Sequence, residues 1–270
     1  MKKYKLENKT IIITGASSGI GYEIAKYLLN NYSVKIIGIS KTPSKINSVF
    51  KEFNERFIPL ALDVSSKSDW QELNNYIIKN ELDIYAIINS AGVLPKFSAF
   101  KNSSSSKVLE VFSVNFNSIL YSAEYVLPFI RKNNGLMVNV TSSSALCPFS
   151  TVSAYSSSKV ASERFSTCLS YEEKNARVVT VMPGFTKTNI MRNQTLDEKE
   201  SKLIDKISSR SDKVAKKIIK KSLKGQRRII IGLDAHMMNF LYKFFPNLAP
   251  KIIGWALRKS KIKIFDEIGK

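Results

Sequence analysis

Short apolar runs of strand length alternate with longer segments of helical periodicity along most of this sequence. The predicted strands cover residues 10–14, 34–39, 57–62, 84–89, 136–141, 177–182 and 228–231. Helical patterns fall between them, at residues 21–30, 68–79, 107–131, 152–174 and 211–224. Such alternation is typical of a parallel sheet whose connecting helices cover both faces.

The predicted fold is therefore α/β, with a single Rossmann-like, doubly wound parallel sheet. Pro59 lies in the third strand, and because proline cannot donate to a ladder, that strand is expected at an edge. Gly225 follows the last of these helices as a plausible C-terminal cap. With no repeat and no domain boundary, residues 1–270 are expected to form one domain, in which residues 233–270 make a C-terminal helical extension.

Composition and charge narrow the classes of partner. The chain has 270 residues, is 44% hydrophobic and carries a net charge of +20. This charge suits nucleic acid, an anionic membrane surface or anionic small molecules, but a lysine-rich composition throughout the chain is the favoured interpretation. The densest basic segment, residues 213–228, has the pattern of a solvated helix face and lacks a recognition-helix or zinc-ligand pattern, so no specific nucleic acid is expected.

Targeting and redox signals are weak. No apolar run approaches the roughly 20 residues that span a bilayer, and the basic N-terminus lacks the apolar region of a signal peptide. Cys147 and Cys168 form neither a disulfide framework nor a metal-ligand spacing, so no metal is expected. We expect a cytoplasmic protein.

Tyr155 and Lys159 are the first candidates for chemistry. Side chains four apart lie on one face of a helix. An ammonium beside a phenol favours the phenolate, so Lys159 is expected to lower the pKa of Tyr155 and make it an acid/base near neutral pH. An ordinary surface pair is the alternative, and the rest of the sequence decides between the two.

A glycine-rich turn, Thr14-Gly15-Ala16-Ser17-Ser18-Gly19-Ile20-Gly21, joins the first predicted strand to the first helix. Glycines at such a turn allow close backbone approach to a pyrophosphate, and the helix that follows offers free N–H groups and a positive dipole end. The spacing Gly-x-x-x-Gly-x-Gly differs from the general dinucleotide fingerprint.

Together these motifs resemble the short-chain dehydrogenase/reductase family of the Tyr-x-x-x-Lys type. The glycine turn is similar to that family's Thr-Gly-x-x-x-Gly-x-Gly, and Asn89-Ser90-Ala91-Gly92 is similar to its Asn-Asn-Ala-Gly. Pro183-Gly184-Phe185-Thr186-Lys187-Thr188 resembles the segment that closes on the nicotinamide. The matching motifs occur in order over about two-thirds of the chain.

The resemblance implies four catalytic residues. Tyr155 would exchange a proton with the carbonyl or alcohol oxygen, and Lys159 would lower its pKa and hold the nicotinamide ribose. Ser142 would hydrogen-bond the substrate oxygen, with Ser144 left open as a second contact. Asn115 would hold a water in a proton relay to Lys159.

The resemblance also implies a cofactor site. Its residues would be Gly15, Ser17, Ser18, Gly19, Ile20, Ser40, Lys41, Asp63, Val64, Asn89, Ala91, Gly92, Tyr155, Lys159, Pro183, Gly184, Thr186 and Thr188. Ile39 stands where an acid would bind the ribose 2′-hydroxyl, and Ser40 and Lys41 suit a phosphate. NADP(H) is therefore the expected cofactor, with NAD(H) possible, and Asp63 resembles the residue that contacts adenine.

The region after Thr188 is less informative. Residues 189–210 resemble a mobile substrate lid. In the extension, Met237, Phe240, Leu241, Phe244 and Phe245 fall on one helical face, and a second apolar face follows at 252–257. Such faces are expected near the substrate entrance, with peripheral membrane contact as a second interpretation. Core packing or a dimer contact is the plain alternative.

The expected function is NADP-dependent hydride transfer between the nicotinamide and a ketone or secondary alcohol, with an apolar substrate. A homodimer or homotetramer is expected. One alternative is a nucleotide-sugar epimerase or dehydratase, but such enzymes usually carry a longer C-terminal domain. A non-enzymatic cofactor sensor is the other alternative, and the presence of Asn115, Ser142, Tyr155 and Lys159 argues against it.

Overall fold

A seven-stranded, all-parallel sheet forms the centre of the molecule, with strand order β3-β2-β1-β4-β5-β6-β9. The computed structural model describes residues 6–42, 50–53, 55–194, 196–260, 262–266 and 268. The strands are β1 (Thr10–Thr14), β2 (Lys35–Ser40), β3 (Phe57–Ala61), β4 (Ile84–Asn89), β5 (Leu136–Val140), β6 (Arg177–Pro183) and β9 (Arg228–Ile231). The predicted strands and the doubly wound sheet are confirmed, and β3 with Pro59 does lie at an edge.

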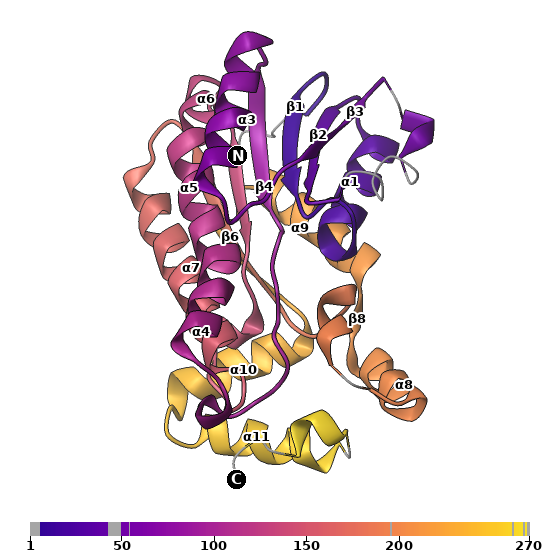
Figure 1. Ribbon diagram of the computed structural model, residues 1–270, viewed down its shortest axis with the longest axis vertical. Helices are drawn as coiled ribbons and strands as arrows, with labels where there is room; N and C mark the ends of the chain where they lie inside the picture. The colour runs from indigo at the N-terminus through magenta and orange to yellow at the C-terminus, as the bar shows by residue number, and fades with distance from the viewer. Residues whose placement is uncertain are drawn as a thin grey trace.

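Helices cover both faces of this sheet (Figure 1). On one face, α1 (Gly19–Asn31) and α9 (Ser211–Leu223) pack together on Ile11 and Ile13 of β1. The other face is covered by α3 (Lys67–Lys79), α5 (Ser118–Tyr125), α6 (Leu127–Lys132) and α7 (Ser153–Glu172). Ile12 lies between Ile11 and Ile13 in β1 and packs on this second face, because successive side chains of a strand point to opposite faces of the sheet.

The long helix expected over residues 107–131 is present as a succession of helical segments. These segments are α4 (Ser105–Phe112), a π-helical turn (Ser113–Asn117), α5 and α6. Pro128 explains the break before α6, because its ring removes a donor and clashes with the preceding turn. The π-helical turn contains Asn115, and such turns occur often at functional sites.

The C-terminal extension lies beside the carboxyl edge of the sheet. It contains α10 (Leu233–Phe244), α11 (Ala249–Lys259) and a short 3₁₀ turn (Lys263–Phe265), and residues 261, 267, 269 and 270 of it lie outside the described residues. Since α10 begins two residues after the end of β9, it starts where the parallel strands end (Figure 1). No helix among the described residues is long and apolar enough to cross a membrane.

Two further elements follow β6. Strands β7 (Thr186–Lys187) and β8 (Ser209–Arg210) form a small parallel pair. Between them lie a 3₁₀ turn (Asn189–Asn193) and α8 (Glu198–Ile207), which begins with a capping box between Asp197 and Glu200. The predicted lid, residues 189–210, covers the 3₁₀ turn, α8 and β8, with residue 195 outside the described residues.

Candidate active site

A cavity of about 450 Å³ lies at the carboxyl edge of the sheet. Its walls come from the segments that follow β1, β2, β4, β5 and β6. This position is where open α/β sheets bind ligands. The predicted residues that line it are Gly15, Ser17, Ser18, Gly19, Ile20, Ser40, Lys41, Val64, Ala91, Gly92, Ser142, Tyr155, Lys159, Pro183, Gly184, Thr186 and Thr188.

The glycine turn brings two loops into backbone contact. Gly15 has a φ of +68°, and a Cβ there would come within 3.0 Å of the Ala91 backbone. The Thr14 hydroxyl accepts the N–H groups of Ser90 (3.0 Å) and Ala91 (3.1 Å), which ties the end of β1 to the loop after β4. A side chain at Gly15 would separate the two loops, so the glycine is what allows this close approach at the cavity.

The N-terminus of α1 faces the same cavity. Its N-cap residue, Ser18, makes no side-chain capping hydrogen bond, so its first N–H groups remain available to an anion. Across the cavity, a Cβ on Gly19 would come 3.2 Å from the Thr188 side chain. The glycine turn and the Thr188 segment therefore close on one narrow space, and its chemistry suits a pyrophosphate.

Tyr155, Lys159 and Ser142 form a cluster that also lines the cavity. Tyr155 is 8% exposed and Lys159 is 3% exposed, and the Lys159 ammonium lies 5.8 Å from the centre of the Tyr155 ring. Lys159 Nζ donates to the Val140 carbonyl at 3.4 Å. The Ser142 hydroxyl hydrogen-bonds with the Tyr155 phenol. The surface-pair alternative is wrong, because both side chains are buried.

The pKa of Tyr155 departs from the expected direction. Burial raises the pKa of the phenol, and the hydrogen bond with Ser142 acts in the opposite sense. Burial also lowers the pKa of Lys159 to about 8. Desolvation therefore dominates both groups, so the Tyr155 phenol keeps its proton at neutral pH, as an acid that protonates a carbonyl oxygen must.

Asn115 is placed by the π-helical turn next to this cluster. It is 1% exposed, its Oδ1 accepts the Val93 N–H (2.8 Å), and its Nδ2 donates to the Val93 carbonyl and to Ser158 Oγ (3.0 Å each). A Cβ on Gly92 would come 3.2 Å from both Asn115 Oδ1 and Lys159 Nζ. The side chain thus fixes the loop after β4 against Lys159, and it lies behind the cavity lining.

The Asn89 amide joins elements of the fold, and its cofactor contact stays a prediction. Its Nδ2 donates to Asn139 Oδ1 and to Ser122 Oγ, at 2.8 Å each. Asn139 in turn donates to Ser166 Oγ at 2.8 Å. These buried amides join β4, β5, α5 and α7 below the cavity, and Asn89 is not among the described residues that line it.

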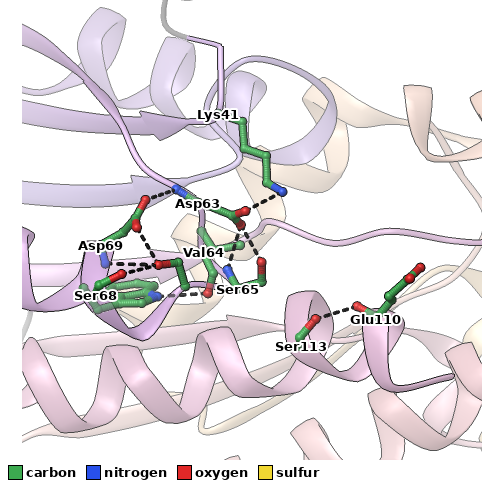
Figure 2. Close-up of polar contacts among 10 residues, drawn as sticks. Lys41, Asp63, Val64, Ser65, Ser68, Asp69, Glu110 and Ser113 are labelled. Carbon is green, nitrogen blue, oxygen red and sulfur yellow. Dashed lines mark hydrogen bonds and ion pairs between the residues drawn. The ribbon is translucent and has the colours of Figure 1, made fainter. Parts of the chain in front are cut away.

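Asp63 lies beside Lys41 but is also outside the described lining of the cavity. Its Oδ2 forms an ion pair with Lys41 Nζ at 2.6 Å, and its Oδ1 accepts from the Ser65 N–H and hydroxyl (Figure 2). Burial alone would raise the pKa of the Asp63 carboxyl, but Lys41 and then the Ser65 hydrogen bonds together hold it below its usual value. The residue that resembles an adenine contact therefore also restrains the predicted phosphate-binding lysine.

Asp234 is a residue that sequence reasoning missed. At the start of α10, its Oδ2 accepts the Phe185 N–H at 2.7 Å, and a Cβ on Gly184 would come 2.1 Å from its Oδ1. The C-terminal extension thereby holds the 183–186 turn in place. An acid just after the last strand was the only signal, and no local spacing connects it with residue 185.

The remaining part of the cavity is apolar and was also missed by sequence reasoning. Its lining includes Leu94, Phe97, Phe149, Val152, Phe185, Ile190, Met191 and Ile204. Phe185 belongs to the motif at residues 183–188 and Ile204 to α8, while the others come from segments before and after the motifs, so no single spacing relates them. Phe265, which is fully buried, supports this end from behind, with ring centres 5.5 Å from Phe97 and 6.3 Å from Phe185.

The extension therefore supports the substrate end through different residues from those expected. Phe244 and Phe245 are not among the described residues that line the cavity, and both are more than half exposed. The contact instead runs through the last 3₁₀ turn, where the Lys263 N–H donates to Glu200 Oε1 of α8 at 2.6 Å. Glu200 is 4% exposed, so this bond joins the predicted lid to the C-terminus inside the protein.

Comparison with known proteins agrees with this geometry. A sequence profile described as short chain dehydrogenase matches residues 9–199. The chain belongs to the short-chain dehydrogenase family. It is 30% identical to estradiol 17-beta-dehydrogenase 2 of Rattus norvegicus over 209 residues, which are 75% of this chain and 55% of the rat protein. It is 24% identical over 269 residues to 11-beta-hydroxysteroid dehydrogenase of Pinus massoniana, covering 94% and 74% of the two chains.

Solved structures show the same fold. A short-chain dehydrogenase from Burkholderia cenocepacia in complex with NADP superposes with a TM-score of 0.77 at 19% identity, over 90% of this chain and 96% of that one. A second, from Burkholderia phymatum in complex with NAD, gives a TM-score of 0.80 at 17% identity, over 91% and 96%. The chain spans about half the length of the rat steroid dehydrogenase, and both cofactors occur among its structural neighbours.

Proposed function

We propose that this protein is an NADP-dependent oxidoreductase that interconverts an apolar ketone and its secondary alcohol. One observation carries the proposal: the buried Tyr155 phenol, hydrogen-bonded with Ser142 and beside Lys159, lies in a cavity that extends from the N-terminus of α1 to an apolar end. Along its length, that cavity offers an anion site, then a proton donor, then a hydrophobic space. Reduction of an apolar carbonyl by a dinucleotide requires these three features.

The nicotinamide cofactor supplies or accepts the hydride, and the residues of this chain manage the proton. Tyr155 donates its proton to the carbonyl oxygen in reduction, and accepts one from the alcohol in oxidation. Ser142 hydrogen-bonds the same oxygen, and the Lys159 ammonium stabilises the phenolate that Tyr155 becomes. Ser144 Oγ is buried with no hydrogen-bond partner among the described residues, which supports it as a second contact to that oxygen.

NADP is the preferred cofactor in this proposal. Ile39, Ser40 and Lys41 line the adenosine end of the cavity without an acid at the end of β2. Lys41 supplies a cation for a 2′-phosphate. Asp63 competes for that cation through its ion pair, so the preference over NAD is expected to be moderate.

The substrate class follows from the lining. Phe97, Phe149 and Phe185 give the substrate end three aromatic surfaces, and apolar substrate area buried there stabilises the complex. Relatives named as steroid dehydrogenases support an apolar ketone or alcohol. Residues 189–210 act as the lid over this end, and a homodimer or homotetramer in the cytoplasm remains a prediction.

A test of this function uses Tyr155→Phe, with Tyr171→Phe as the matched control. Tyr171 lies on the same helix α7 but is 80% exposed. Ketones and alcohols of graded polarity, together with nucleotide sugars, are screened by NADPH absorbance. Tyr155→Phe should lower kcat at least about a hundredfold while NADPH binding, measured by fluorescence, stays within a few-fold. The control should match the wild type. Turnover by Tyr155→Phe at the wild-type rate would refute the mechanism, and activity confined to nucleotide sugars would favour the epimerase or dehydratase alternative.

A further inference from the structure

Several large apolar side chains in the C-terminal extension are exposed to solvent, and six of them are considered together. Met237, Phe240, Phe244, Phe245, Leu248 and Trp255 are each 50–56% exposed, and we call them the tail patch. Met237, Phe240 and Phe244 follow the 3–4 spacing of one face of α10. The rings of Phe240 and Phe244 lie 4.9 Å apart. Single exposed apolar residues are ordinary, but a contiguous group of large ones indicates an interaction surface.

The protein's own core does not use this face. The inner faces of α10 and α11 already pack together, in a cluster that contains Cys147, Met238, Ala249 and Ile253. Met238 on α10, and Ala249 and Ile253 on α11, occupy the helical positions opposite the tail patch, so the patch points away from the rest of the fold. The two helices lie next to each other at the end of the molecule (Figure 1). The patch is therefore available to a partner.

Cations stand directly among these apolar side chains. Lys243 Nζ lies 5.5 Å from the centre of the Phe244 ring, and Lys259 Nζ lies 4.9 Å from that of Trp255. Lys251, on the first turn of α11, is exposed as well. Lysine stems can lie along apolar surface while their ammonium groups reach outward. The patch thus combines an apolar centre with positively charged groups, on a chain of net charge +20.

We propose that the tail patch binds the surface of an anionic lipid bilayer. A second copy of this chain fits less well, because a two-fold contact through the same patch would bring the lysines of one copy against those of the other. Anionic headgroups instead neutralise the lysines, while the aromatic and aliphatic side chains enter the headgroup boundary.

The geometry allows the helices to lie on a membrane and not to cross it. Helix α10 has 12 residues and α11 has 11, whereas a spanning helix needs about 20. Because α10 begins at the carboxyl edge of the sheet, docking would bring the edge that holds the cavity toward the bilayer. The proposal does not depend on which substrate the cavity accepts.

The experiment measures flotation of the full chain with vesicles of phosphatidylcholine alone, or of phosphatidylcholine mixed with phosphatidylglycerol. Wild-type protein should float with the anionic vesicles and much less with the neutral ones. Raising salt from 0.1 M to 1 M shortens the Debye length from about 10 Å to about 3 Å and should weaken binding. Phe240→Gln with Phe244→Gln should reduce the partition coefficient by about tenfold or more per ring, since each ring loses its burial in the bilayer.

A matched control replaces Ile78 and Tyr171 by Gln. These residues are 58% and 80% exposed and lie on the last turns of α3 and α7, at the amino edge of the sheet. This variant should float like the wild type. Trp255 offers a second readout in the unmodified protein, because it is half exposed while Trp70 is fully buried. Its emission should shift to the blue on anionic vesicles, and Trp255→Phe should remove that shift.

Three results would overturn the proposal. One is wild-type protein that neither floats with anionic vesicles at low salt nor changes its emission. Another is flotation that Phe240→Gln with Phe244→Gln leaves intact, because the patch would then not be the contact. The third is self-association in sedimentation that the same double variant abolishes while vesicles are not bound, which would assign the patch to a second copy. Thermal melting of each variant checks that the fold is retained.

Discussion

Replacing Lys41 tests the cofactor proposal most directly. Lys41 Nζ lies 2.6 Å from Asp63 Oδ2 (Figure 2), at the end of the cavity where the proposal places the adenosine. NADPH and NADH differ there only by the 2′-phosphate. Lys41→Ala should therefore weaken NADPH binding and leave NADH binding nearly unchanged, whereas Asp63→Asn should free the ammonium and increase the preference for NADPH.

The expected change in NADPH affinity depends on how exposed the Lys41 side chain is. Two unit charges 4 Å apart interact by about 1 kcal/mol in bulk water and about 4 kcal/mol near a protein surface. The Lys41 side chain is 62% exposed, so solvent screening places the effect at the low end, near 1–1.5 kcal/mol. This corresponds to roughly a five- to tenfold rise in the Kd for NADPH. The difference should shrink at high salt because the contact is exposed.

The assay is titration of each protein with NADPH and with NADH, followed by fluorescence. The ratio of the two Kd values is the readout, because any loss of an adenine contact at Asp63 acts equally on both cofactors. Lys35→Ala is the control, since this exposed lysine begins the same strand at the opposite edge of the sheet. Equal Kd values in the wild type, or a ratio that Lys41→Ala leaves unchanged, would refute the role of Lys41.

Two other substitutions test buried groups. Burial lowers the pKa of Lys159 to about 8, below its usual value of 10.5. Between about pH 8 and 10.5 the unfolded chain therefore binds more protons at this side chain than the folded one. The contribution of Lys159 to the free energy of unfolding rises with pH across that window. Lys159→Met should therefore raise the free energy of unfolding by on the order of 3 kcal/mol at pH 7 and by less than about 1 kcal/mol at pH 10. Denaturant unfolding at the two pH values measures both effects. An equal effect at both would contradict the buried charge. Phe265→Ala should cost about 3–5 kcal/mol of stability and raise KM for an apolar ketone more than for a small polar one, in steady-state kinetics. Phe245→Ala, at an exposed position, should leave both KM values unaltered. If Phe245→Ala raised KM for the apolar ketone and Phe265→Ala did not, the end of α10 would support the substrate end in place of the last 3₁₀ turn.

The sequence predicted the backbone of the site because its motifs are local. Each motif joins a strand to the segment that follows it, and parallel strands bring these segments to one edge. Helical spacing alone predicts that Tyr155 and Lys159 lie on one face of a helix. Pro59 predicts an edge strand because proline has no backbone N–H to donate. The glycine turn identifies the cofactor end for the same reason, since close backbone contact needs small residues wherever the rest of the chain lies.

The parts that could not be predicted depend on contacts between distant residues. Asn89 bonds with Asn139, 50 positions away, and only the assembled sheet shows that this amide faces the interior. Phe185 meets Asp234, 49 positions away, through a backbone N–H that carries no signal in a sequence. The pKa of Tyr155 was expected to fall because a neighbouring charge can be read from spacing, whereas the depth of burial that raises it cannot.

The strand order also implies an order of assembly during synthesis. β1, β2 and β3 are neighbours both in the chain and in the sheet, so this half can form as soon as it is made. β4 must then return to the free side of β1, and each later strand adds outward from it. A nascent chain that ends after α7 already carries Tyr155 and Lys159, but lacks the Thr188 wall and the Asp234 contact. During synthesis the proposed proton donor is therefore made well before the residues that would enclose a cofactor beside it.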